Sequence, residues 1–388
     1  MKKLMNYAIY SNEKLSIDGL DVFYVGVENI LPNKKGIKPS SFVPKTGKYT
    51  KFEKYDILLG NIGPYLKKIW LADKSGLASP DVLVIKPLES RFGKYIYANL
   101  LNDSFFQYAM LGVKGSILPR CDKNHIMNYS IPDVKNKEKI GDFIYFINKK
   151  IELNNKINDN LEKQMKLLYD YWFTQFDFPD KNGNPYKSSG GEMVFNEELK
   201  RYIPNGWSVK KMSDIILKKS NPFKFESTEP TIDLSVMPQN SISLTTANTS
   251  SNFSTNLFRM SEGDILFGSI RPYLRKAGIA PFNGAVAGTI HSFIPKFQYN
   301  YNFALITISS DSFFKYAISQ SQGTKMPIVS WQSILSYKFP YNKEISKKFN
   351  IFNIKNIIAK NSQQIIYLTS LRDYLLPLLL NGQVTIED

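Results

Sequence analysis

The sequence predicts an α+β protein in which two similar mixed α/β domains are joined by a pair of long helices. We expect these helices to form an antiparallel coiled coil that gives the chain pseudo-twofold symmetry. Three observations support this fold class: a long helical pattern in mid-chain, an internal repeat that spans most of the 388 residues, and a second long helical pattern near the end.

The central helix is predicted from apolar residues that recur every third or fourth position between residues 140 and 172. This alternating spacing is the pattern of a coiled-coil seam. At 1.5 Å per residue the helix would be roughly 50 Å long, and its seam needs a partner. The predicted seam comprises Ile147, Ile151, Asn154, Asn158, Leu161, Met165, Leu168 and Trp172.

The repeat is found by aligning the chain with itself at a shift of 208 residues. Residues 55–68 then lie over residues 263–276 with nine of the fourteen positions identical. The same shift places residues 103–109 over residues 311–317. Because separate stretches share one shift, we interpret the match as a duplication, and each half should have the same order of elements.

Each half should begin with a mixed region of about 130 residues. Its strands are predicted from short β-branched and aromatic runs such as residues 22–25, 82–85 and 292–294. A short helix should follow at residues 104–111 and again at residues 312–319. The long helix then completes each half.

The second long helix is predicted at a shift of 203 residues from the first. Asparagines offer an N-cap to each long helix, Asn136 to the first and Asn342 to the second. Pro377 should kink the last turn, and Gly382 should end the helix. The predicted seam on this helix comprises Ile357, Asn361, Gln364, Leu368, Leu371 and Leu375.

These patterns divide the chain into five parts. They are a first domain (residues 1–135), a central long helix (136–175), a linker loop rich in Pro, Asn and Gly (176–202), a second domain (203–341) and a C-terminal long helix (342–388).

Three asparagines interrupt the two apolar seams: Asn154, Asn158 and Asn361. A buried amide is costly in an apolar seam unless it is paired. We therefore expect these asparagines to pair with each other and to fix the register of the helices. The alternative is that they face solvent through a defect in the seam.

The composition favours a polyanionic partner. Lys and Arg outnumber Asp and Glu by 50 to 34, which gives a net charge of +16, and nucleic acid is the first expectation for such a chain. The alternative is that a lysine-rich proteome explains the charge. Cys121 is the only cysteine and His125 and His291 are the only histidines, which excludes an internal disulfide and clustered-cysteine or multi-histidine metal sites. With no apolar run long enough to span a bilayer, we expect no membrane partner and a cytoplasmic location.

Two surfaces in each domain are candidates for binding double-stranded DNA. The first is the turn after the Gly-Asp-Ile-Leu segment, where cations lie among aromatic residues as on phosphate-binding surfaces. The second is the glycine-containing loop after the short helix, whose small and hydroxyl residues allow close approach to a phosphate. The alternative is that the aromatic residues belong to the core and the lysines to a solvated face. The candidate residues are Tyr65, Lys67, Lys68, Lys114, Ser116, Arg120 and Lys123 in the first domain, and Arg271, Tyr273, Arg275, Lys276, Thr324, Lys325, Trp331 and Gln332 in the second.

Several runs carry a resemblance to a known family, the specificity subunits of Type I restriction-modification systems. They are Leu-Tyr-Asp-Tyr-Trp-Phe-Thr-Gln-Phe-Asp-Phe-Pro at residues 168–179, Gly-Asn-Pro-Tyr-Lys-Ser-Ser-Gly-Gly at 183–191, Ile-Pro-Asn-Gly-Trp at 203–207 and Leu-Arg-Asp-Tyr-Leu-Leu-Pro at 371–377. The resemblance covers essentially the whole chain. One departure is that the first domain lacks the Ile-Pro-Asn-Gly-Trp segment that precedes the second.

This resemblance implies a fold and a function. Two target-recognition domains would each read one half of a bipartite DNA site, and an antiparallel coiled coil would set the gap between the half-sites. The subunit would be non-catalytic. It would dock two methyltransferase subunits that use S-adenosylmethionine, and the full complex would add restriction and translocase subunits driven by ATP with Mg. Base-reading positions do not carry over from the family.

An enzymatic function finds no support in the motifs. Asn-Pro-Tyr at residues 184–186 has one proline where an adenine methyltransferase motif has two, and Asp81 lacks the Glu-x-Lys that a nuclease of the paired-carboxylate type needs. No P-loop is present, so ATP chemistry is not expected in this chain. The remaining alternative is a basic coiled-coil scaffold that does not read DNA sequence.

Overall fold

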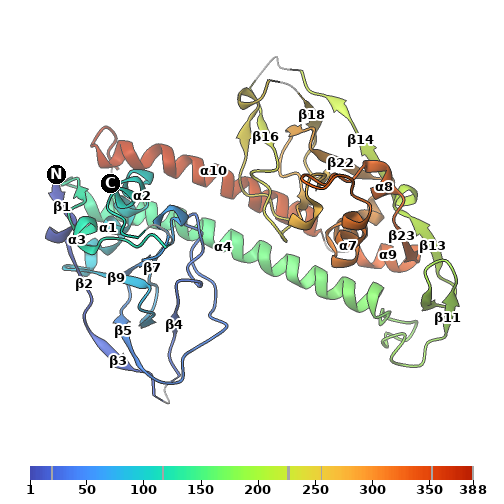
Figure 1. Cartoon of the computed structure of the whole chain (residues 1–388), viewed down its shortest axis with the longest axis horizontal. Coiled ribbons are helices and arrows are strands. Elements are labelled where there is room, and N and C mark those ends of the chain that lie inside the picture. The colour runs from blue at the N-terminus through green and yellow to red at the C-terminus, as the bar shows by residue number, and fades with distance from the viewer. Residues whose placement is uncertain (19–20, 116–117, 225–227, 255, 351–352, 387–388) are drawn as a thin grey trace. The chain divides into compact units, whose positions relative to one another are not determined.

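The computed structural model describes residues 1–18, 21–115, 118–224, 228–254, 256–350 and 353–386 (Figure 1). The contacts divide the chain into two compact units. Unit 1 contains Met1–Leu153 and Tyr367–Asp388, and unit 2 contains Asn154–Ile366. This division differs from the predicted domains because each long helix contributes to both units.

Unit 1 contains two four-stranded sheets and a two-stranded one. The first sheet has the order β2-β9-β6-β7, with β2 Ala8–Tyr10, β9 Val82–Pro87, β6 Ile57–Gly60 and β7 Ile69–Leu71. The second has the order β3-β5-β8-β4, with β3 Lys14–Ser16, β5 Lys48–Phe52, β8 Gly76–Ala78 and β4 Tyr24–Val25. The small sheet pairs β1 Lys2–Lys3 with β10 Ser130–Ile131.

The helical elements of unit 1 before the long helix are short. They are η1 Leu4–Asn6, η2 Pro64–Leu66, η3 Ser90–Phe92, α1 Gly93–Leu100, α2 Asp103–Leu111 and α3 Lys123–Met127. Asn102 caps α2, because its side chain accepts a hydrogen bond from the Ser104 amide at 3.1 Å. Helix α1 packs against β7 and β9 of the first sheet (Figure 1).

Alternating side chains on the first sheet create two cores in unit 1. Ile57 and Leu59 of β6 point into a core shared with helices α1 to α3, whereas Leu58 points into a second core with Trp70 and Phe52. Strand β6 is therefore buried on both faces, which explains its uninterrupted apolar sequence.

Unit 2 repeats this arrangement element by element, as the duplication predicts. Its first sheet has the order β14-β22-β19-β20, with β14 Ile216–Lys219, β22 Ile290–Pro295, β19 Ile265–Gly268 and β20 Ala277–Ile279. Its second has the order β15-β18-β21-β16-β17, with β15 Asn221–Pro222, β18 Leu257–Met260, β21 Gly284–Ala287, β16 Pro230–Ile232 and β17 Asn248–Thr249. Strand β13 Ser208–Lys211 pairs with β23 Lys338–Tyr341.

The helical elements of unit 2 follow the same order. They are α5 Met212–Ile215, η5 Ser250–Asn252, η6 Pro272–Leu274, η7 Gln298–Asn300, α6 Tyr301–Ser309, α7 Asp311–Ser319, α8 Trp331–Leu335 and α9 Lys343–Phe349. The predicted short helices at residues 104–111 and 312–319 correspond to α2 and α7, each one residue longer at the N-terminus. The predicted strand at residues 22–25 is shorter than expected, since β4 contains only Tyr24 and Val25.

The central long helix is α4, Lys137–Tyr169, followed by a π-helical turn at Asp170–Thr174. It starts one residue after the predicted cap Asn136. The predicted linker loop is wrong in part, because it contains the hairpin of β11 Met193–Asn196 and β12 Arg201–Pro204. Backbone turns and the Asp177 carboxylate, which accepts from the Ser188 amide at 2.7 Å, order the segment before this hairpin.

The C-terminal region differs from the single long helix predicted for residues 342–388. Asn342 is an N-cap, but it caps the short helix α9, where its side chain accepts from the amides of Glu344 and Ile345. The long helix is α10, Ile354–Leu380. Helix α9 is separate because Ile345 and Phe349 are buried in the core of unit 2. Gly382 follows the end of α10 with φ +70°, as predicted for a C-terminal glycine.

Candidate nucleic-acid interface

The same tight turn projects a tyrosine from each unit. We call it the Pro-Tyr-Leu turn; it is η2 in unit 1 and η6 in unit 2. Left-handed residues flank both copies, Gly63 and Lys67 in the first and Arg271 and Arg275 in the second. The tight backbone leaves the central side chain outside the core: Tyr65 is 58% exposed and Tyr273 is 51% exposed.

The cations that follow this turn bind back to their own unit. Lys67 forms an ion pair with Asp103 at the start of α2 (Nζ–Oδ1 2.9 Å), and Arg275 pairs with Asp311 at the start of α7. Lys68 donates to the Val27 carbonyl at 2.8 Å, and Lys276 donates to the Leu234 carbonyl. These four candidates hold the turn against a helix and a loop in each unit.

The surroundings of these groups shift their pKa values. Burial raises the pKa of Asp103, but the hydrogen bonds from Lys67 and Lys34 outweigh that effect and the net pKa is lowered. Burial lowers the pKa of Lys68, and the nearby charge of Lys38 lowers it further. Both groups are therefore set by contacts inside unit 1.

The glycine-containing loop, residues 112–121 in unit 1 and 320–329 in unit 2, lies beside the Pro-Tyr-Leu turn in each unit. The Gly63 amide donates to the Pro119 carbonyl at 2.9 Å, and the Arg271 amide donates to the Pro327 carbonyl at 2.7 Å. Gly115 and its counterpart have φ of +88° and +97°, a conformation that favours glycine. The two predicted surfaces of each domain are thus one surface, which we call the loop frame.

Paired backbone hydrogen bonds close the loop frame identically in the two units. Lys114 and Arg120 exchange both N–H···O bonds at 3.0 and 2.9 Å, and Gln322 and Ile328 do so at 2.9 and 2.9 Å. Each of these four residues is the counterpart of another at the shift of 208. The backbone is therefore the same while the side chains differ.

The candidate side chains of the loop frame lie at the surface. Lys114 pairs with Asp122 at 2.5 Å, and Arg120 pairs with Asp81, its Nη1 lying 2.9 Å from Oδ1. Lys123 is exposed on the first turn of α3. Ser116 lies outside the described residues. In unit 2 the exposed candidates of this part are Thr324, Lys325 and Gln332.

Trp331 is half-buried rather than free at the surface. It packs against the core of unit 2, and Lys218 lies over its ring at 5.1 Å from the centroid. The motif analysis missed Asp103 and Asp311, which fix the cations of the turn. The signal was available in the sequence, because an aspartate occupies this position in both copies of the repeat.

A lysine-rich loop in unit 1 was also missed. Residues 31–48, between β4 and β5, contain five lysines and no acidic residue, whereas residues 233–256 of unit 2 contain no lysine or arginine. Lys34 points inward, where it donates to Asp103 at 2.9 Å, but Lys38, Lys45 and Lys48 are exposed. The exposed three add positive charge to unit 1 alone.

The seam asparagines pair with α10 inside unit 2. Asn361 Nδ2 donates to Asn158 Oδ1 at 2.9 Å, and Asn154 Nδ2 donates to Gln364 Oε1 at 3.0 Å. Numbers rise along one helix as they fall along the other, so the helices are antiparallel here. Asn154 and Asn158 are each 1% exposed, which confirms pairing between asparagines and contradicts the seam-defect alternative.

The seam differs in detail from the prediction. On α4, Ile147, Ile151 and Met165 are buried and Leu161, Leu168 and Trp172 are half-buried. On α10, the most buried positions lie one residue away from the predicted seam, at Ile358, Ser362, Ile365 and Leu376. Of the predicted α10 residues, Ile357 is 43% exposed, Gln364 is exposed, and Asn361, Leu368, Leu371 and Leu375 are half-buried. The reason is that α10 also packs against the domain cores, and the residues between the two contacts are buried most deeply.

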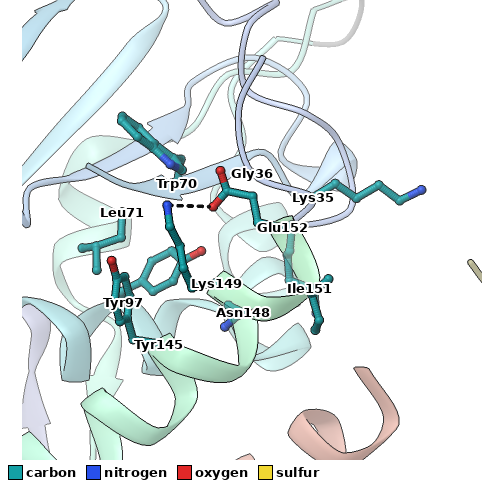
Figure 2. Close-up of a pocket in the computed structure, with 11 residues that line it drawn as sticks. Lys35, Gly36, Trp70, Leu71, Tyr97, Tyr145, Asn148, Lys149, Ile151 and Glu152 are labelled. Carbon is teal, nitrogen blue, oxygen red and sulfur yellow. Dashed lines mark hydrogen bonds and ion pairs between the residues drawn. The ribbon is translucent and has the colours of Figure 1, made fainter. Parts of the chain in front are cut away.

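A small cavity lies against α4 in unit 1 (Figure 2). Its volume is about 20 Å³, which is room for a single water molecule. Lys149 reaches across it to Asp73 at 2.9 Å and to Glu152 at 3.5 Å. Figure 2 shows Lys149 and Glu152 facing each other between the α4 helix and Trp70. These charges fix α4 to unit 1 and leave no space for an organic substrate.

The remaining reactive groups are held in structural contacts. Burial raises the pKa of the Cys121 thiol to about 11, which makes it a poor nucleophile near neutral pH. His125 stacks on Tyr108 at 4.0 Å between ring centroids, and burial lowers the pKa of His291. Among the described residues, no group of three or more His, Cys, Asp or Glu could hold a metal ion. No helix in the described part of the chain is long and apolar enough to cross a membrane.

Comparison with known proteins gives one curated relative and several solved structures. No protein-family model matches the chain. The specificity subunit of the Type I restriction enzyme MjaIX from Methanocaldococcus jannaschii is 24% identical over 321 residues, which is 78% of this chain and 72% of that protein. The Type I restriction-modification S subunit from M. genitalium aligns with a TM-score of 0.50 and 16% identity over 97% of this chain and 94% of that one.

A further structure, the HsdS subunit from Thermoanaerobacter tengcongensis, aligns at 13% identity with a TM-score of 0.34 over 99% of this chain and 96% of that one. The first two comparisons agree with the sequence motifs quoted above. The resemblance to Type I specificity subunits, predicted from those motifs, is therefore confirmed in overall sequence and in fold.

Proposed function

We propose that this chain is the DNA-specificity subunit of a Type I restriction-modification complex. Each unit presents one loop frame to one half of a bipartite duplex site. The observation that carries this proposal is the pair of loop frames, which have the same backbone hydrogen bonds and different exposed side chains. Two modules with a common frame and divergent surfaces are what the reading of two different half-sites requires.

The charge and the helix pair support the same function. An excess of Lys and Arg attracts the phosphates of DNA, and the exposed lysines of the lysine-rich loop extend that surface in unit 1. The antiparallel helices set the spacer between half-sites and provide the surface on which two methyltransferase subunits dock. Restriction and translocase subunits complete the complex.

This chain contributes recognition and no chemistry. S-adenosylmethionine, ATP and Mg belong to the partner subunits, and the complex works in the cytoplasm. What supports a non-catalytic role is that the groups most able to react, Cys121, His125 and His291, are engaged in packing and hydrogen bonds.

The first test is DNA binding by the purified complex of this chain with its cognate methyltransferase. Fluorescence anisotropy with a duplex should give a steep, linear fall of log K with log salt concentration, with a slope of about −0.9 per phosphate contacted. Methylome sequencing of a host that expresses the complex should show one bipartite motif. A complex that binds no duplex at low salt would favour the alternative function, a basic coiled-coil scaffold without sequence reading.

The second test assigns the half-sites. Exchange of residues 1–135 for the equivalent region of a relative should change one half of the methylated motif and leave the other half and the spacer unchanged. A change in both halves would contradict the assignment of one half-site to each unit.

A further inference from the structure

The inference concerns which residues on the loop frames distinguish one base from another, and it rests on the proposed function. The two frames superimpose in their hydrogen bonds at every backbone position described so far. The amide of Asn61 donates to the Asp81 carbonyl at 2.9 Å, and Ser269 donates to the Thr289 carbonyl at 2.9 Å. Residues 81 and 289 therefore belong to the frame, beside residues 120 and 328.

Side chains on this common frame fall into two classes. Pro-Tyr-Leu is identical in the two turns, so the exposed tyrosines Tyr65 and Tyr273 offer the same hydroxyl and ring to both half-sites. A contact that is the same in both units cannot distinguish two half-sites of different sequence. These tyrosines are suited to the sugar–phosphate backbone, which positions a protein without reading sequence.

The second class differs between the units at one place. In unit 1 this place holds the ion pair of Arg120 with Asp81, with side chains 50% and 37% exposed. In unit 2 the counterparts are Ile328, which is 46% exposed, and Thr289, which is half-buried. The charged pair of one frame is thus replaced by an apolar and a hydroxyl side chain in the other.

This difference matches a chemical difference between base pairs. A guanidinium can donate two hydrogen bonds to O6 and N7 of guanine in the major groove, and a carboxylate that holds one of its nitrogens fixes its direction. An aliphatic side chain has no donor for guanine and packs instead against the thymine methyl group. Position 120 and its counterpart 328 thus carry side chains suited to different bases.

We infer that positions 120 and 328, with their neighbours 81 and 289, determine specificity in the two domains. Arg120, oriented by Asp81, reads a guanine in the first half-site, and Ile328 reads a thymine methyl group in the second. Tyr65 and Tyr273 bind the backbone in both half-sites alike.

The test exchanges the side chains between frames. One variant carries Arg120→Ile with Asp81→Thr, and the reciprocal variant carries Ile328→Arg with Thr289→Asp. Each is purified with the cognate methyltransferase, and the methylome of the host is sequenced. We expect the first exchange to remove a G·C requirement from the first half-site only, and the second to introduce one in the second half-site only. The control is Arg91→Ile, because Arg91 is also exposed and ion-paired (with Glu89, 2.7 Å) but lies away from the loop frame, in η3.

A competition assay decides the case in which an exchanged variant no longer methylates. Anisotropy with duplexes that carry one substituted base pair should show about tenfold discrimination for guanine with the unmodified chain and little with Arg120→Ile and Asp81→Thr. Circular dichroism and thermal melting establish that the variant is folded. If folded variants keep the original half-sites and the original discrimination, the inference is overturned. If the unmodified complex itself binds no duplex, the proposed function fails instead.

Discussion

The side-chain amide of Asn361 on α10 donates a hydrogen bond to Oδ1 of Asn158 on α4, at 2.9 Å, in the otherwise apolar contact between the helices. Asn158 is 1% exposed, so neither group of this pair can turn to water without opening the contact. A shift of one helix along the other would leave both amides buried and unpaired, which costs about 1–3 kcal/mol for each. This pair therefore specifies the register of the coiled coil.

A double-mutant cycle should measure this coupling. Asn158→Ala, Asn361→Ala and the double variant, each in the full chain, should give a coupling free energy of unfolding of about 1 kcal/mol. The contact of Asn158 with Ser362 is lost in both arms of the cycle and cancels. A parallel cycle on Asn160 and Gln164, an exposed pair at 3.4 Å, should give a coupling near zero. Equal coupling in the two cycles would mean that the asparagine pair does not fix the register.

The lysine-rich loop should carry part of the salt dependence of DNA binding. Substitution of Lys38, Lys45 and Lys48 by Ser should make the slope of log K against log salt shallower by up to about 2.7, since each phosphate contact contributes about 0.9. The measurement is anisotropy of the methyltransferase complex on its own duplex over a range of salt concentrations. The methylated motif should not change, because phosphate contacts carry no sequence information.

The matched control for this variant removes the same charge elsewhere. Lys181, Lys187 and Lys200 are exposed in the segment around the β11–β12 hairpin, and their replacement by Ser changes the net charge by the same amount. If both triple variants reduce the slope equally, net charge rather than the lysine-rich loop accounts for the effect.

The ion pair that anchors the first Pro-Tyr-Leu turn should lose its effect in acid. The folded state lowers the pKa of Asp103, so the stability it contributes is present above the unfolded pKa of about 3.9 and is lost as pH falls through the folded value. Because the side chain is 55% exposed, we expect Asp103→Asn to cost less than about 1 kcal/mol at neutral pH. The difference in Tm between the two proteins should shrink as pH falls from 6 towards about 3.

The control for the acid experiment is Asp21→Asn, at an exposed position outside the turn. Its Tm difference from the unmodified chain should stay small across the same pH range. A Tm difference for Asp103→Asn that does not depend on pH would show that the ionised carboxylate has no part in holding the turn.

The sequence predicts most of this fold because the repeat and the helical seams are strong, long-range signals. The duplication implies two copies of one domain, and the structure has them element by element, from the buried strands β6 and β19 to the helices α2 and α7. The break between α9 and α10 was not predicted, since Asn342 offers the same N-cap signal whether a short or a long helix follows it.

The candidate interface was predicted less completely. Lysines near an aromatic residue suggest phosphate contacts, but the sequence does not tell which cations bind inward. Lys67 and Lys68 are consumed by Asp103 and the Val27 carbonyl, partners that are distant in sequence. By contrast, Tyr65 is as exposed as a contact residue requires. Position 120 was found because the two copies differ there, which shows how a repeat separates frame residues from reading residues.

The helix pair should act as a ruler for the DNA spacer, and its contacts suggest where to lengthen it. Arg372 Nη1 donates to Asn148 Oδ1 at 2.7 Å in unit 1, while Asn154 pairs with Gln364 in unit 2. One heptad inserted after Ile151 in α4 and one after Leu368 in α10 would leave both contacts intact. Seven residues add about 10.5 Å of helix, and DNA rises about 3.4 Å per base pair, so the spacer should grow by up to about three base pairs.

Single insertions provide the contrast for the ruler experiment. A heptad in α4 alone or in α10 alone cannot satisfy both the Asn148–Arg372 and the Asn154–Gln364 contacts, so one end of the pair must lose its register. We therefore expect each single insertion to abolish methylation of the bipartite site, while the matched double insertion restores methylation at a longer spacer with both half-sites unchanged. Methylome sequencing of hosts that carry the three variants distinguishes these outcomes. An unchanged spacer in the matched variant would show that the helices join the recognition domains without setting the distance between the half-sites they read.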